Sequence, residues 1–254
     1  MSISEALRVI GRHWHESSSP EQKRILSFAQ DALVFISETG QWYPVQDFRE
    51  RRTPPVDASD FNEGAGEWNA RLSQTARFFE KLLADTSSDD ERGHIRFILD
   101  VLQFIASTQQ TEALGAFIQR TEAHAPPMVV ASFETAEQAE AWLKNHPNPP
   151  AFAEVLIGDR YHDVVYDRET NFRRLPWNRH FEHYLGWLER HDPPVAQASF
   201  ATRGEAETWL RRQAHPPAKA WVSIAGEFYL AVFHANVNHR ALYPLSMADR
   251  TALE

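Results

Sequence analysis

Histidine pairs are the residues of this sequence whose type and spacing could hold a metal ion. The chain contains twelve histidines and no cysteine, so any metal ligands would have to be imidazoles and carboxylates. His180 and His183 are three residues apart on an expected helix, a spacing that lets two rings face one ion. His234 and His239 flank a short turn. We identify no third ligand for either pair, so we expect no metal and no other cofactor.

A second group of polar residues could form an acid–base pocket. Arg160, His162, Asp163 and Arg168 belong to one expected hairpin. Asp163 could orient the ring of His162 while an arginine holds an anionic group. The alternative is a solvated strand face whose charges pair across the strands. These four residues form the alternative ligand pocket that the sequence suggests.

The motifs of the common enzyme classes do not occur in the chain. The serine-nucleophile motif Gly-x-Ser-x-Gly, the metal motif HExxH and both glycine-rich phosphate-binding loops are absent from the sequence. The lack of cysteine also excludes a thiol nucleophile and a disulfide framework. We therefore expect no catalytic residues and a protein that is not an enzyme.

Charge and hydropathy limit the partners. The 254 residues carry 26 basic and 35 acidic side chains, a formal charge of −9 that repels polyanions, so we expect no general nucleic-acid binding and a basic protein partner. No apolar run reaches the roughly 20 residues that cross a membrane. The N-terminus lacks the layout of a signal peptide. We expect a cytoplasmic protein with no membrane contact.

Two internal repeats organise the elements that must position these residues. Residues 7–51 align without gaps with residues 76–120, with twelve identities. Residues 131–177 align with residues 198–244, with 18 identities. The sequence therefore predicts an internally duplicated domain at 1–124 and a second one at 125–254.

The first repeat has the pattern of helices. Apolar residues recur at three and four spacing, and serines precede acidic residues at equivalent places in both copies, as at helix starts. A loop with prolines and glycines, residues 52–66, separates the copies. We expect an all-helical bundle of about six helices, near 3–15, 20–37, 44–51, 67–84, 89–107 and 110–122.

The second repeat has the pattern of strands around one helix. In the first copy a strand at 129–133, a helix at 136–143, a strand at 152–157, a returning strand at 161–166 and a last strand at 172–175 are expected. Residues 178–191 form a connecting helix. A single unit of this kind leaves a sheet face uncovered, so we expect the two β-α-β-β(β) copies to pair. The fold class is therefore α+β.

A short segment carries a local resemblance. Residues 84–91, Ala-Asp-Thr-Ser-Ser-Asp-Asp-Glu, resemble the entry to the acidic toxin-binding helix of the colicin DNase immunity proteins. The paired tyrosines that follow in that family have no counterpart here. The resemblance covers eight residues and implies an acidic surface for a basic protein.

Three functions fit these observations. The leading hypothesis is a non-catalytic protein-binding protein of the immunity, antitoxin-like or regulatory kind. One alternative is an enzyme or small-ligand-binding protein with a site between the two β-α-β-β copies, and another is a structural subunit that associates with itself through its strand edges. The residues expected to contact the partner are Trp42, Asp57, Asp60, Glu63, Trp68, Asp89, Asp90 and Glu91.

Overall fold

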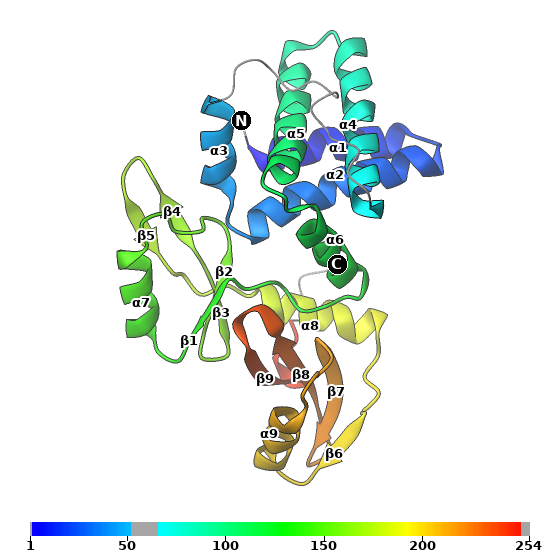
Figure 1. The fold of residues 1–254 in the computed structure, drawn as a ribbon. Helices are drawn as coiled ribbons and strands as arrows, with labels where there is room; N and C mark the ends of the chain where they lie inside the picture. The colour runs from blue at the N-terminus through cyan, green and yellow to red at the C-terminus, as the bar shows by residue number, and fades with distance from the viewer. Residues whose placement is uncertain (1, 52–65, 250–254) are drawn as a thin grey trace. The chain divides into compact units, whose positions relative to one another are not determined.

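The computed structural model describes residues 2–51 and 66–249 and has the expected α+β class. Helices fill the first half of the chain, and the second half contains the sheets (Figure 1). The backbone divides into two compact units, Met1–Thr121 and Glu122–Glu254. Each unit has its own core.

Unit 1 is helical, and the helices expected there are present with ends within two residues of the predicted ones. Serine caps explain two of the starts, because the side chain of Ser19 accepts a hydrogen bond from the amide of Gln22 and that of Ser88 accepts one from Glu91. The helices are α1 (Ile3–Glu16), α2 (Pro20–Glu38), α3 (Trp42–Arg51), α4 (Glu67–Asp85), α5 (Asp89–Ser107) and α6 (Thr111–Glu122).

The core of unit 1 is built around α2 and α5. Most residues of α5 from His94 to Ile105 are buried, which explains why its apolar stripe is so broad. Gln41 and Gln110, at the starts of α3 and α6, exchange two side-chain hydrogen bonds of 2.8 and 2.9 Å. Two phenylalanine pairs, Phe35 with Phe117 and Phe48 with Phe104, make edge-to-face contacts in the same core.

Unit 2 contains three sheets. Their strand orders are β1-β2-β3, β4-β5 and β6-β7-β8-β9, with β1 parallel to β2 and β6 parallel to β7. The elements are β1 (Ala131–Phe133), α7 (Ala136–Asn145), β2 (Glu154–Ile157), β3 (Arg160–Asp163), β4 (Val165–Asp167), β5 (Phe172–Arg174), α8 (His180–His191), β6 (Ala198–Phe200), α9 (Arg203–Arg212), β7 (Lys219–Ile224), β8 (Glu227–His234), the 3-10 turn η2 (Ala235–Val237), β9 (His239–Pro244) and the 3-10 turn η3 (Leu245–Met247).

The returning strand expected at 161–166 is interrupted in the structure. β3 ends at Asp163 and β4 begins at Val165. At Val164 the backbone bonds to Phe152 and Ala153, outside the regular ladder, and Phe152 has a φ of +71°, which an aromatic residue rarely adopts. This irregular crossing divides the first copy into two small sheets. The second copy keeps one continuous sheet of four strands.

The sheets share their pairing registers. Ala131 lies opposite Val155 in the first sheet, and 67 residues later Ala198 lies opposite Val222. The pair Glu154 with Asp163 recurs in the same way as Trp221 with Leu230. Equivalent positions of the two copies therefore occupy equivalent places on their sheets.

Alternation along the strands assigns each sheet two faces. In β7, Ala220, Val222 and Ile224 pack in a core with Ala206 and Leu210 of α9. The residue between them, Trp221, faces the opposite way and packs in a core that contains α8. This second core also includes side chains from the first copy, namely Val129, Leu156 and Tyr161. Unit 2 is therefore held together by a core that both copies share.

A close contact between α4 and α6 yields the first test. A Cβ atom added at Gly115 would lie 2.4 Å from the ring of Trp68, whereas one added at Gly11 on α1 would meet nothing within 4 Å. We expect Gly115→Ala to lower the free energy of unfolding by about 1–3 kcal/mol through overpacking. Gly11→Ala should raise it by about 0.5–1 kcal/mol, because alanine favours helix. Urea unfolding measures both, and equal effects would contradict the packing.

Candidate binding site

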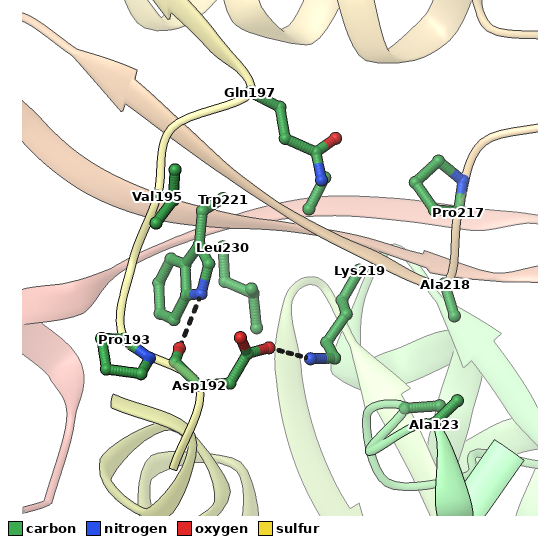
Figure 2. A pocket seen from close by; sticks show the side chains of 12 residues that line it. Ala123, Asp192, Pro193, Val195, Gln197, Pro217, Ala218, Lys219, Trp221 and Leu230 are labelled. Carbon is green, nitrogen blue, oxygen red and sulfur yellow. Dashed lines mark hydrogen bonds and ion pairs between the residues drawn. The ribbon is translucent and has the colours of Figure 1, made fainter. Parts of the chain in front are cut away.

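Unit 2 contains a pocket of about 430 Å³ beside the first half of β7 (Figure 2). This volume lies in the range of sites that hold small ligands or a few side chains. Its walls are mostly apolar. The lining residues are Ala123, Ala125, Asp192, Pro193, Val195, Gln197, Pro217, Ala218, Lys219, Ala220, Trp221 and Leu230.

An ion pair supplies the charge in the pocket. Nζ of Lys219 lies 2.6 Å from Oδ2 of Asp192, and Figure 2 shows the two side chains pointing toward each other. The lysine side chain is only 16% exposed, whereas that of Asp192 is 50% exposed. Nε1 of Trp221 donates a hydrogen bond of 3.2 Å to the carbonyl of Asp192. These contacts fix the chain directly after α8 against β7.

The pocket borders an open strand edge. The amide of Phe233 donates to the carbonyl of Ala218, so Ala218 and Ala220 point their backbone groups toward β8. Because these directions alternate, the amide and carbonyl of Lys219 point the other way, toward the side of β6. The first hydrogen bond from that side runs from Gln197 to the carbonyl of Trp221, two residues further along β7. The backbone of Lys219 is therefore unpaired on this side.

Two prolines explain why this edge stays open. The segment that leads from α8 to β6 contains Pro193 and Pro194, which have no amide hydrogen to donate to β7. The chain therefore joins the sheet only at Gln197. Val195, in the middle of the segment, is 76% exposed although it lines an apolar pocket. An apolar wall and unpaired backbone groups thus occur together.

Sequence reasoning did not find this pocket. Lys219 and Trp221 occupy the positions that Phe152 and Glu154 hold in the first copy. The change from a carboxylate to a tryptophan between the copies was the available signal. It could not reveal the role of Asp192, whose contact with Lys219 spans 27 residues.

The residues expected to contact a partner have different surroundings in unit 1. Asp89 and Asp90 are exposed in the first turn of α5. Trp42 lies edge-to-face on Phe97, and Trp68 packs over Gly115, so both tryptophans are half-buried. The other predicted contacts Asp57, Asp60 and Glu63 lie outside the described residues.

Glu91 is held by contacts inside unit 1. Its carboxylate lies 2.5 Å from Nη2 of Arg12 and 2.8 Å from Nε2 of His13. Burial alone would raise the pKa of Glu91, but the hydrogen bond from His13 and the charge of Arg12 outweigh burial and lower the pKa. The carboxylate therefore links α1 to α5 within unit 1.

The structure separates the members of the alternative ligand pocket. His162 and Asp163 are neighbours in β3, so their side chains point to opposite faces. Nδ1 of His162 donates to the carbonyl of Leu175 at 2.9 Å, whereas Oδ1 of Asp163 accepts from Nδ2 of Asn178 at 2.7 Å. Arg160 is exposed at the start of β3, and Arg168 is half-buried in the turn after β4.

The histidine pairs have carboxylate partners of their own. His180 lies 2.9 Å from Glu154, His183 lies 3.5 Å from Asp249, and His239 lies 3.1 Å from Asp159. Within residues 2–51 and 66–249, no three metal-binding side chains gather in a geometry that could hold an ion. Over the same residues, every helix is too short or too polar to cross a bilayer.

Comparison with protein-family models, with curated proteins and with solved structures finds no match to this chain. Functional arguments therefore depend on the sites themselves.

The Glu91 contacts predict a pH-dependent stability. We expect Glu91→Gln to lower the free energy of unfolding at pH 7 by about 1–3 kcal/mol, because it removes a charged hydrogen-bond acceptor. The pKa of Glu91 is lowered by folding, so its stabilisation is present above the ordinary carboxyl pKa and is lost as pH falls through the folded value. Urea unfolding at pH 7 and at low pH measures this. Asp90→Asn, at a side chain that is 90% exposed, is the control. A deficit that persists in acid would contradict the account.

Proposed function

We propose that this chain is a binding protein whose second unit captures an extended segment of a partner protein. The observation that carries the proposal is the combination of an apolar pocket with an open strand edge at Lys219. A segment that lies along β7 can satisfy the unpaired backbone groups and place one apolar side chain in the pocket. The main-chain bonds supply affinity, and the pocket selects the side chain.

The walls of the pocket favour a compact apolar side chain. Val195, Pro193, Pro217 and Trp221 offer aliphatic and aromatic surface. The charge of Lys219 is matched by Asp192 at 2.6 Å, so the site gains nothing from a second acid unless that acid displaces Asp192. The proposed segment is therefore apolar and extended at this point.

Unit 1 supplies the proposed second contact. Asp89 and Asp90 are exposed, and the acidic first turn of a helix together with a net charge of −9 supports attraction of a basic partner. Trp42, Trp68 and Glu91 would support this surface from behind, because each makes contacts within the unit. Such charges act mainly on the rate of association.

We also infer that both units arose by internal duplication. Equivalent helices of unit 1 start 69 residues apart at α1 and α4 less one turn, at α2 and α5, and at α3 and α6. In unit 2 the pairing registers recur after 67 residues. Duplication gives two copies of one scaffold, and the open edge at β7 is then a specialisation of the second copy.

The pocket can be tested with a photo-crosslinking amino acid at Pro217, on its exposed rim. In the native host we expect adducts to one protein, at one extended segment, which mass spectrometry of digested adducts identifies. A synthetic peptide of that segment is then titrated against the unmodified chain. Val195→Asp should weaken binding at least about tenfold, because it places a charge in an apolar wall.

Val165→Asp is the matched control. Val165 is an exposed valine of the same unit, on β4 and outside the pocket. It should change the affinity by less than about twofold. Adducts only to a second copy of this chain, adducts without a common segment, or equal weakening by both variants would overturn the proposed binding mode.

A further inference from the structure

Three polar side chains that are distant in the sequence form one hydrogen-bonded chain in unit 2. Oγ of Ser132 lies 2.9 Å from Nδ1 of His239, and Nε2 of the same ring lies 3.1 Å from Oδ1 of Asp159. The first contact spans 107 residues and the second spans 80. The chain is distinct from the pocket beside β7, whose lining contains none of the three.

The contacts assign the proton on the imidazole. An ionised Asp159 can only accept, so Nε2 of the neutral ring carries the hydrogen. Nδ1 then has a free lone pair directed at the hydroxyl of Ser132. This is the relation of nucleophile, base and orienting carboxylate in the serine–histidine–aspartate triad, with the two ring nitrogens exchanged.

Strand alternation explains how the three residues meet. Ala131 and Phe133 pack in the core beside α7, so Ser132, between them, faces away from α7. His239 shares a face of β9 with Ala241 and Tyr243, which belong to the core shared by both copies. The outer faces of the two copies therefore bring the serine and the histidine together.

Reagents can reach this place. The side chain of Asp159 is 44% exposed and that of His239 is 20% exposed. Asp159 also lies 3.6 Å from Nη2 of Arg203, a charge that favours the ionised carboxylate. The carbonyl of Phe133 accepts from Gly158 on the β2 side, so the amide of Ser132 points to the open edge of β1 and can donate to an oxyanion.

We propose that Ser132 is the nucleophile of an acyl-transfer site that accepts small carboxylic esters. Oγ bonds to the ester carbonyl carbon while its proton moves to Nδ1 of His239. The tetrahedral intermediate expels the alcohol, which takes that proton. Water then repeats the sequence on the acyl-serine and releases the carboxylic acid, so no further reactant is needed. Asp159 is a positioning residue that holds the ring.

The second copy provides a matched control. Ser199 holds the place of Ser132 in β6, is more exposed, and has Gly226 where the first copy has Asp159. An accessible serine without the histidine and the carboxylate should not react. The difference between the two serines isolates the hydrogen-bonded chain from simple exposure.

The experiment treats the full chain with a fluorophosphonate probe and maps the adduct by mass spectrometry. We expect the adduct on Ser132 and not on Ser199. Ser132→Ala should abolish labelling, Ser199→Ala should leave it unchanged, and His239→Gln should slow it about 100-fold or more. Asp159→Ala should slow labelling, and Asp159→Glu should restore most of the rate.

Hydrolysis of p-nitrophenyl acetate is the second readout, with Ser199→Ala as reference. We expect it to fall with Ser132→Ala in proportion to the labelling. An unlabelled Ser132 in the unmodified chain, an adduct mainly on other serines, or a His239→Gln variant that labels at the original rate would each overturn the proposal. The mapping on the unmodified chain decides even if a variant fails to fold.

Discussion

The constraint on which unit 2 depends is that each of its main sheets has two faces but only one helix of its own. α7 covers one face of the first sheet and α9 one face of the second, through cores that include Leu143 and Leu210. The remaining faces can leave water only by packing on α8 and on each other. Tyr161, Phe181 and Tyr243 meet there, one from each part. A sheet of this size without that cover would be marginal, so both candidate sites inherit their geometry from this shared core.

Differences between the copies at the shared face set where polar chemistry can occur. Glu154 and Asp163 lie directly opposite each other in the first copy, at the places of Trp221 and Leu230 in the second. Nδ2 of Asn178 donates to both carboxylates, at 2.8 and 2.7 Å, which offsets their repulsion. The same two positions of the second copy are apolar and line the pocket beside β7. One scaffold thus places charges in one copy and an apolar cavity in the other.

Local patterns predicted most elements, because their causes are local. The serine caps at Ser19 and Ser88 and the apolar stripes defined the helices of unit 1, and the α+β class followed. The break at Val164 was missed because it depends on the unusual backbone of Phe152. The polar residues of one hairpin, His162 and Asp163 among them, were grouped by sequence proximity, although strand alternation separates their side chains. Contacts across 27 to 107 residues, such as those of the pocket and of Ser132, leave no local motif.

Amide hydrogen exchange at Lys219 tests the central claim, an open edge of β7 that a partner closes. In the free chain the account predicts fast exchange at Lys219 and slow exchange at its neighbour Ala220, whose amide points toward β8. With the identified peptide bound, exchange at Lys219 should slow at least about tenfold while Ala220 stays as it was. A Lys219 amide that is already protected in the free chain, or one that the bound peptide leaves unprotected, would contradict the account.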